Sequence, residues 1–510
     1  MTKQRTAPPG SWLRRGAPLG LAAATALTFA ACGELDPGTE GQTGELATEN
    51  DANAFGTLEV FSSTGNIDRN NPFFKSLGAN GRTCNSCHLL RDGLGINTGA
   101  INSIFNNTNG TDPLFRTNDG SNAPTGVFAD TSTLNARRNS FSMLLNHGTI
   151  RVGIGMPTGA DFTSTAISDP YHFASTKEFS LFRRPLPSVN VAFNTLVMWD
   201  GRESEGRPAT RDALKNQAND ATQGHAQRAT PIDDATRSAI ADFQLKLFAG
   251  QINSNVGSPA VGSLTVAGCT TSASPDDPGA CKAAHGGGRA LANVLTMGNE
   301  DFPAFTPGIN DSFKPGFNNI SFIVFEPWES PTLGPAPMIN GQPVNATITK
   351  NRGEVGDGEN IFYTKDINIT GVAGLNDVLG QPVVKGHCTT CHNTPDVGNH
   401  SLPRFFNIGI ANVQGNPLFR TDYPQYTFKN TSTGATVTVS DPGLALRTGK
   451  FADIGKFKVP ALRTLGNRAP YFHNGMANSL QDVLNFYNQR FNIGFTAEEM
   501  RKIIVFLNQT

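Results

Sequence analysis

The sequence contains few charged residues, and neither sign is in excess. Charged side chains make up 16% of the 510 residues, and 41 Lys and Arg are balanced by 42 Asp and Glu. A nucleic-acid-binding protein usually carries a basic surface, so we expect no nucleic-acid partner.

The 54 Gly and 32 Pro favour compact units joined by long irregular loops, and the length allows two or three domains.

Long apolar runs are also scarce. After the N-terminus no segment reaches the roughly 20 apolar residues of a membrane-spanning helix. Residues 1–32 have a basic start, an apolar run and small residues before Cys32, which is the pattern of an export signal. Ala30, Ala31 and Cys32 resemble a lipoprotein signal, although Phe29 stands where such signals usually carry Leu. We therefore expect a periplasmic or cell-surface protein, either secreted or lipid-anchored through Cys32. Residues 33–53, acidic and rich in Gly and Thr, are typical of a flexible tether.

Cysteine is rare too, but four of the seven cysteines lie in two C-x-x-C-H motifs. In such a motif the two thiols form thioethers with haem vinyl groups, and the adjacent histidine binds the iron. A zinc finger would need a different ligand spacing, and a thioredoxin-like redox pair would need a βαβ context. We therefore predict two covalently attached haem c groups. The motif residues are Cys84, Cys87 and His88 in the first, and Cys388, Cys391 and His392 in the second.

Apart from Cys32, the two cysteines outside the motifs, Cys269 and Cys281, are expected to form a disulfide in an exported protein.

An internal repeat accompanies the two motifs. The pentapeptide PLFRT occurs at 113–117 and again at 417–421, and each copy begins 25 residues after the motif histidine. A shared word at a shared offset indicates duplicated cytochrome units. Arg116 and Arg420 then hold equivalent places, where a guanidinium could pair with a haem propionate, although a solvated loop arginine is an alternative.

Periodicity and breakers suggest a mainly α fold. Residues 232–249 predict a helix with Gly250 just past its end, and residues 496–509 predict another that begins with a Thr496/Glu499 capping box. We expect two cytochrome c-like haem domains, at 54–250 and 353–510, with long loops. The Gly-, Ser- and Pro-rich residues 251–352 would form an inserted irregular segment that contains some β structure.

Residues 183–203 (RRPLPSVNVAFNTLVMWDGRE) and 457–475 (FKVPALRTLGNRAPYFHNG), together with the two haem motifs, resemble the bacterial di-haem cytochrome c peroxidases and the related MauG enzymes. The resemblance implies that His88 binds the haem that reacts with peroxide and His392 binds an electron-relay haem. It also implies that Trp199 lies between the two haems, although Trp199 could instead be a core residue.

The sequence departs from that family at two places. The family has a Gln and then a Glu over the reactive iron; Gln217 matches the first, but His225 stands near the second. Imidazole can also move a proton at neutral pH, and the alternative is that His225 is an exposed structural histidine.

The second departure concerns calcium. Family members bind calcium near an Asn and a Thr, whose positions here are Arg184 and Arg468. Guanidinium groups are poor neighbours for a cation that needs oxygen ligands, so we expect no calcium there.

The second axial ligand of the relay haem is open on sequence grounds. The family places Met or, in MauG, Tyr fourteen residues after the His of PYFH, which implies Tyr487. Leu480, Val483, Leu484 and Tyr487 share one helical face, which fits an inward ring but equally fits a core residue. The rival ligands are Met476, His473 and His400.

The functional expectation is an exported di-haem oxidoreductase. Peroxide would react at the N-terminal haem, with electrons from a small cytochrome c or cupredoxin, or the oxidising equivalents would be used on a protein or organic donor as in MauG. Two alternatives are an oxygenase that uses O2, related to the rubber oxygenases, and a non-catalytic electron-transfer cytochrome.

Overall fold

The computed structural model of the chain describes residues 45–46, 48–207, 209–254, 262–263, 312–315, 317, 338–339, 342–343, 346–392 and 403–510. The export signal with Cys32, the expected Cys269–Cys281 disulfide, His400 and most of the 251–352 segment lie outside these residues. The chain divides between Thr43 and Gly44, and residues 44–510 form one compact unit. The arrangement into two cytochrome c-like domains stays a prediction.

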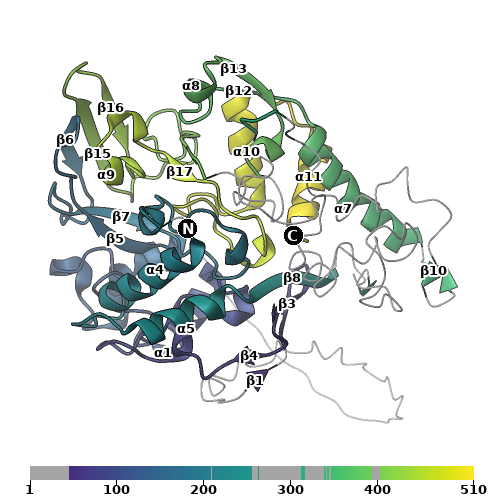
Figure 1. The fold of residues 1–510 in the computed structure, drawn as a ribbon, viewed down its shortest axis with the longest axis horizontal. Coiled ribbons are helices and arrows are strands. Elements are labelled where there is room, and N and C mark those ends of the chain that lie inside the picture. The colour runs from purple at the N-terminus through teal and green to yellow at the C-terminus, as the bar shows by residue number, and fades with distance from the viewer. Residues whose placement is uncertain are drawn as a thin grey trace, which may run out of the picture. The chain divides into compact units, whose positions relative to one another are not determined.

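The helices that matter for the site form two groups (Figure 1). In the first, α4 (Thr210–Gly224) packs against α5 (Asp234–Gln244), and α1 (Thr98–Thr108) packs against α3 (Ser142–His147). In the second, α11 (Ala497–Leu507) packs against α7 (Ala346–Thr364) and α10 (Leu480–Phe491). The other described helices are α2 (Leu134–Ser140), α8 (Asn376–Leu379) and α9 (Ala445–Thr448).

The strands form small antiparallel sheets. The order β2-β3-β8-β9 joins Thr48–Asn53, Gly56–Ser62, Leu247–Ser254 and Gly262–Ser263. The order β16-β15-β6 joins Thr436–Val439, Gln425–Asn430 and Phe162–Ser168, and so links distant parts of the sequence. The two-stranded sheets pair β5 (Ile150–Ile154) with β7 (Phe179–Arg183), β12 (Ile367–Thr370) with β13 (Val383–Gly386), β14 (Phe405–Phe406) with β17 (Phe457–Lys458), β1 (Glu45–Leu46) with β4 (Ile67–Asp68), and β10 (Met338–Ile339) with β11 (Gln342–Pro343).

One helix is shorter than its sequence predicts. The periodicity favours a helix over 232–249, but α5 starts after the Asp233 cap and ends at Gln244. Leu247 instead begins β8, in which Phe248 pairs with Phe61 of β3 and Gly250 pairs with Glu59. The rings of Phe61 and Phe248 stack with centroids 5.9 Å apart. Pairing with a strand nearly 190 positions earlier in the sequence therefore overrides the local helical pattern.

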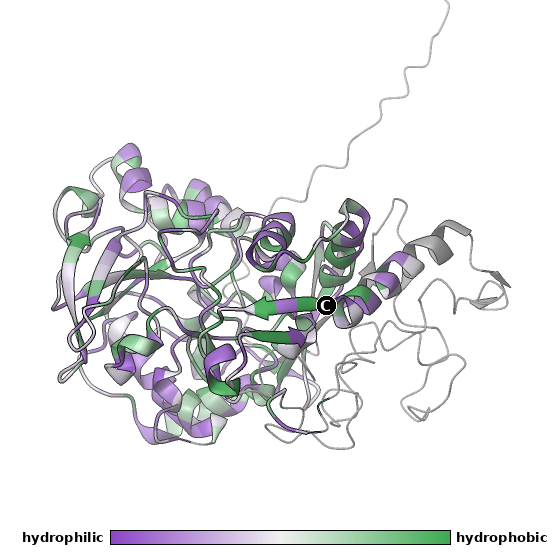
Figure 2. Ribbon diagram, turned by 90° about the horizontal axis from the view of Figure 1, so that it is seen from above, coloured by the Kyte–Doolittle hydropathy of each residue, from purple (hydrophilic) through white to green (hydrophobic). Residues whose placement is uncertain are grey.

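The C-terminal helix agrees with its sequence signals. The Thr496 side chain accepts from the Glu499 amide, and the Glu499 side chain accepts from the Thr496 amide, which forms the expected capping box. Ile503, Phe506 and Leu507 of this helix are buried. The helices in Figure 2 carry both hydrophobic and hydrophilic residues, as expected for helices with one buried face.

The two PLFRT copies adopt similar turns. In the first, the Asp112 side chain accepts from the Leu114 amide at 2.7 Å; in the second, the Asn416 side chain accepts from the Leu418 amide at 3.0 Å. Each haem motif also opens with a 3-10 turn, over Cys84–Ser86 and Cys388–Thr390. The local structure thus repeats along with the sequence.

Within the part of the chain that the structure describes, we find no helix with both the length and the apolar character needed to span a bilayer.

Candidate functional site

The first C-x-x-C-H motif presents a histidine with one ring nitrogen already committed. The His88 amide bonds the Cys84 carbonyl at 3.1 Å, which closes the turn. Its Nδ1 lies 3.1 Å from the Leu94 carbonyl and 3.2 Å from the Ser188 hydroxyl. A carbonyl only accepts, so Nδ1 carries the proton, and the lone pair of Nε2 is the one that could bind a metal. Burial lowers the pKa of His88 to about 4, so the ring is neutral near pH 7, as a metal ligand must be.

The second motif has a similar backbone turn. The His392 amide bonds the Cys388 carbonyl at 2.9 Å. Burial lowers the pKa of His392 to about 4, and the nearby carbonyl of Pro460 partly offsets this effect. The four motif cysteines are free thiols, and burial raises the pKa of each, to about 11 for Cys87 and about 12 for the other three.

Each motif opens into its own cavity, of about 170 Å³ for the first and about 210 Å³ for the second. Both walls are largely apolar, as an inserted macrocycle requires. A pair of unlinked thiols and a neutral imidazole at each wall fit covalently attached haem. The first cavity also has Gln217, His225, Asp119 and Arg82 in its wall, and the second has His473, Tyr487, Tyr471 and Arg468.

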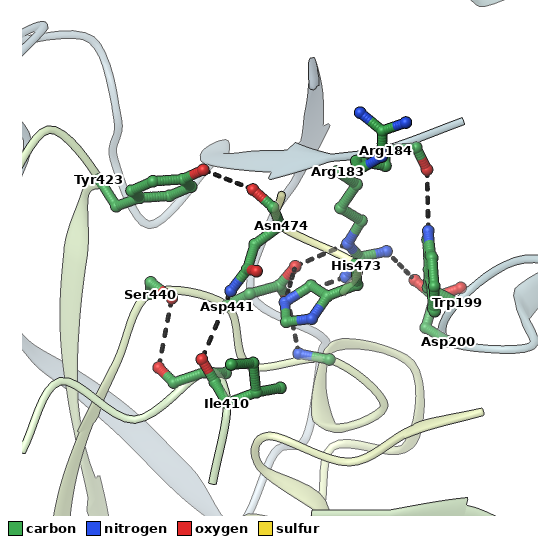
Figure 3. A network of polar contacts seen from close by, with 12 residues as sticks. Arg183, Arg184, Trp199, Asp200, Ile410, Tyr423, Ser440, Asp441, His473 and Asn474 are labelled. Atoms are coloured by element: carbon green, nitrogen blue, oxygen red, sulfur yellow. Dashed lines mark hydrogen bonds and ion pairs between the residues drawn. The ribbon is translucent and has the colours of Figure 1, made fainter. Parts of the chain in front are cut away.

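Trp199 contributes to the walls of both cavities. Its indole N–H donates to the Arg184 carbonyl at 2.8 Å, and only 8% of the residue is exposed. Figure 3 shows the ring beside His473, whose ring centroid lies 6.1 Å away in an edge-on arrangement. Trp199 therefore lies in a wall that the two cavities share, and its place between two haems stays a prediction.

The turn that holds Trp199 depends on a glycine. Gly201 has φ +69°, and a Cβ at this position would lie 2.4 Å from the Phe405 ring. A side chain here would be strained by the backbone conformation and would force the Phe405 ring to move, which accounts for the glycine of the WDGR sequence.

Buried charges surround this turn. Arg183 donates to Asp441 at 2.7 and 2.9 Å and to Asp200 at 2.6 Å, as drawn in Figure 3. Burial would raise the pKa of Asp200, but the Arg183 and Arg202 charges outweigh it and hold that pKa at about 2. Because both carboxylates are paired with one guanidinium, the strand β7 and the Trp199 turn are fixed relative to residue 441.

Helix α4 supplies one wall of the first cavity. Leu214, Gln217, Ala218, Ala221 and Thr222 recur at helical spacing along this wall, and His225 follows at the C-cap. Gln217 and His225, the two residues aligned with the family's distal groups, therefore face the same cavity as His88.

His225 does not stand alone. Its Nδ1 lies 2.5 Å from a carboxylate oxygen of Asp119, and the other Asp119 oxygen forms a buried ion pair with Arg82. Burial opposes the charge of Asp119, but Arg82 and the His225 contact lower its pKa below the usual range. Sequence reasoning missed both Asp119 and Arg82. Neither residue belongs to a motif, and the repeat does not mark Asp119, because the equivalent position after the second PLFRT copy is Tyr423.

The candidate second ligands of the C-terminal motif separate in space. Tyr487 of α10 lies in the wall of the second cavity with Cys388, Cys391 and His392. Met476 lies in another cluster, with its sulfur 3.9 Å from the Asn416 amide nitrogen, and does not line this cavity.

His473 does line the second cavity, but its ring stacks on Phe457 with centroids 3.8 Å apart. Its Nε2 lies 3.8 Å from Asp441. Burial lowers the pKa of His473 to about 4.

Arg116 and Arg420 line neither cavity. Arg116 donates to the Asn80 carbonyl at 2.7 Å, and Arg420 lies on the surface 3.6 Å from Asp422. Their pairing with haem propionates stays a prediction.

Arg184 is a buried cation among backbone oxygens. Its guanidinium donates to the carbonyls of Ile96 (2.5 Å), Arg468 (3.0 Å), His147 (3.2 Å) and Gly148 (3.4 Å). Burial, together with the Arg468 charge, lowers the pKa of Arg184 to about 10, which still leaves it charged at neutral pH. Carbonyl oxygens are ligands that calcium also uses, and here an arginine already occupies them.

The chain is similar in sequence to known cytochrome c peroxidases. The chain is 34% identical over 109 residues to cytochrome-c peroxidase IdrP1 of Denitromonas iodatirespirans, which covers 20% of this chain and 28% of that protein. It is 30% identical over 134 residues to cytochrome c551 peroxidase of Nitrosomonas europaea, covering 26% and 33%. It is 31% identical over 105 residues to methylamine utilization protein MauG of Paracoccus denitrificans, covering 20% and 25%.

These similarities confirm the resemblance to the bacterial di-haem cytochrome c peroxidases and MauG, and with it haem c as the type of cofactor. The matched segments span between a quarter and a third of the length of these three relatives. No protein-family model matches the chain.

Proposed function

We propose that the protein is an exported oxidoreductase that carries two haem c groups and reduces hydrogen peroxide at the first cavity, with electrons that enter at the second. One observation carries the proposal: two cavities, each with a complete C-x-x-C-H motif, share Trp199 in their walls. The relatives named as cytochrome c peroxidases support the reaction class.

The first cavity has the groups that peroxide reduction needs. His88 would hold the haem iron, and the haem would supply the centre at which peroxide is reduced. His225 would take a proton from one peroxide oxygen and return it to the other as the O–O bond breaks. Gln217 can donate and accept hydrogen bonds but cannot accept a proton, so its role would be to orient the peroxide. One peroxide, two electrons and two protons give two waters.

The second cavity would receive the electrons. His392 and Tyr487 would hold the iron, because Tyr487 lines the same cavity as His392 whereas Met476 does not. The third described candidate, His473, is stacked on Phe457 with ring centroids only 3.8 Å apart. Small electron-donor proteins, such as a cytochrome c or a cupredoxin, are one class of partner. A phenolate ligand would stabilise ferric iron, which favours a protein or organic donor of the MauG kind.

The site of action would be the periplasm or the cell surface, as the N-terminal sequence predicts, with Cys32 as the attachment point if the protein is lipid-anchored.

The proposal is tested by producing the protein in a host that attaches haem c. The expected product has two haems per chain, and combined Cys84→Ala and Cys87→Ala substitutions should remove one. Low-temperature electron paramagnetic resonance of the half-reduced protein should show one haem with an open position. Peroxide should be consumed with a reduced cytochrome or cupredoxin as donor.

Two results would point to the alternatives. Two six-coordinate low-spin haems in every redox state, with no peroxide turnover, would indicate an electron-transfer cytochrome. Consumption of O2 with an organic substrate, without any reaction with peroxide, would indicate an oxygenase.

A further inference from the structure

Asp119 links two groups in the wall of the first cavity. One of its oxygens contacts Nδ1 of His225 at 2.5 Å, and the other pairs with Nη1 of Arg82. The side chains of Arg82 and Asp119 are 3% and 8% exposed, whereas that of His225 is 36% exposed. A buried ion pair therefore ends at a histidine that is only partly enclosed.

Arg82 cannot easily move away from Asp119. Its Nε donates to the Pro113 carbonyl at 2.8 Å, and its Nη2 donates to the Leu114 carbonyl at 2.7 Å. Both carbonyls belong to the first PLFRT copy, so the guanidinium is held by the backbone on one side and by Asp119 on the other. The carboxylate is thereby fixed in place with its charge retained.

This arrangement decides which nitrogen of His225 carries a proton. A carboxylate can only accept, so the hydrogen at the contact must come from Nδ1. In the neutral ring Nε2 is then the basic atom, and the contact also fixes the ring orientation. Without Asp119, both tautomers and several orientations would be accessible to a partly exposed histidine at a helix end.

We propose that Asp119, anchored by Arg82, is a positioning residue that holds His225 with Nε2 as the proton acceptor for hydrogen peroxide. The inference rests on the proposed function of the first cavity. In the step it serves, Nε2 takes the proton from one oxygen and gives it to the other when the O–O bond breaks. The departing oxygen leaves as the first water. Two electrons from the donor of the proposed reaction and two protons from solvent then convert the other oxygen to the second water.

The test compares ligands that bring a proton with a ligand that does not. Hydrogen cyanide must lose its proton to bind ferric haem as cyanide, whereas carbon monoxide binds ferrous haem with no proton transfer. We expect Asp119→Asn to slow both the peroxide reaction and cyanide association by about 10–100-fold, the usual effect of losing an orienting outer partner. The rate of carbon monoxide binding should stay close to that of the unchanged protein, because this ligand binds without proton transfer.

The chain offers a matched control. Asp422 also contacts a buried histidine, with its Oδ2 2.8 Å from Nε2 of His147, but neither residue lines either of the two haem-motif cavities. Asp422→Asn should leave cyanide and peroxide kinetics unchanged. A similar slowing in this variant would attribute the effect to general loss of a buried pair and would overturn the proposal.

The double variant separates the proposal from the function on which it rests. If Asp119 acts through His225, then adding Asp119→Asn to His225→Ala should cause no further slowing of cyanide or peroxide. A His225→Ala variant that reacts with peroxide at the normal rate would refute the acid/base role of His225. A slow His225→Ala variant beside a normal Asp119→Asn variant would refute only the positioning role.

Folding is a separate concern, because Asp119→Asn leaves the buried Arg82 charge without its partner. Should that variant not fold, Arg82→Gln with Asp119→Asn removes both charges together and still lacks the carboxylate. Slow cyanide association with normal carbon monoxide binding supports the proposal. Equal loss of both ligands would show a structural role and overturn it.

Discussion

Tyr487 can bind iron as an anion only if its phenol loses a proton. Burial raises the pKa of Tyr487 well above that of a free phenol, so in the absence of metal the ring stays neutral. Ferric iron would have to supply the free energy of deprotonation, and the resulting phenolate would stabilise the ferric state.

We therefore expect Tyr487→Phe to raise the reduction potential of one haem by on the order of 100 mV, a small part of the roughly 0.8 V range that axial ligands control. Potentiometric titration measures this, and one low-spin ferric signal should change at the same time. Tyr471→Phe is the control, because Tyr471 also lines the second cavity but donates to the Leu465 carbonyl at 2.9 Å. An unaltered spectrum in Tyr487→Phe would exclude Tyr487 as the ligand.

Candidate site residues that belong to a sequence motif could be predicted from the sequence, whereas those outside any motif could not. The C-x-x-C-H spacing marked His88 and His392, and alignment with WDGR marked Trp199. Asp119 belongs to no motif, and its importance depends on a contact with His225 more than 100 positions away. Such a contact depends on how the loop after PLFRT packs against the end of α4, which local pattern does not encode.

At the scale of elements, Arg184 joins segments that are far apart in the sequence. The four carbonyls it binds come from residue 96, from residues 147–148 at the end of α3, and from residue 468. Its own amide donates to the His473 carbonyl at 2.7 Å, and its own carbonyl accepts from Trp199. One buried cation therefore connects α3, the segment before α10 and the Trp199 turn.

We expect the isolated protein to contain no tightly bound calcium at this place. We also expect Arg184→Ala to lower the free energy of unfolding by about 2–4 kcal/mol, because the buried carbonyls then lose their hydrogen-bond donor. Elemental analysis and thermal unfolding measure the two effects. Arg138→Ala, a change at an exposed arginine of α2, is the control. Stoichiometric calcium among these carbonyls in the unchanged protein would contradict the prediction. Partial rescue of Arg184→Ala by guanidinium or calcium ions would support it.

Helices were predictable where both ends carry local signals. The capping box at Thr496 fixes the start of α11, and the structure agrees. The prediction that α5 extends to residue 249 was wrong, because the apolar pattern of residues 247–249 fits a helix face as well as a strand. Their pairing with β3 decides the outcome, and that partner lies far away in the sequence.

At the scale of the whole molecule, the proposed function requires the two cavities to act together. Among the described residues, Trp199 is the aromatic one that lies in the walls of both cavities. Its indole N–H donates to the Arg184 carbonyl. Indole is more easily oxidised than the benzene ring of phenylalanine. If each cavity holds a haem, as proposed, a tryptophan here would carry charge between the two irons better than a phenylalanine would.

We expect Trp199→Phe to keep both haems and to keep cyanide binding at the first cavity. Transfer of electrons between the haems should slow by about tenfold or more, which corresponds to roughly 1.4 kcal/mol in activation free energy. Mixing half-reduced protein with peroxide in a stopped-flow instrument gives this rate. Tyr423→Phe is the matched control, because the Tyr423 hydroxyl also donates to a backbone carbonyl, that of Asn474, while the ring lines neither cavity. Equal rates in Trp199→Phe and the unchanged protein would mean that electrons cross between the cavities by another path, and the shared wall would then have only a structural role.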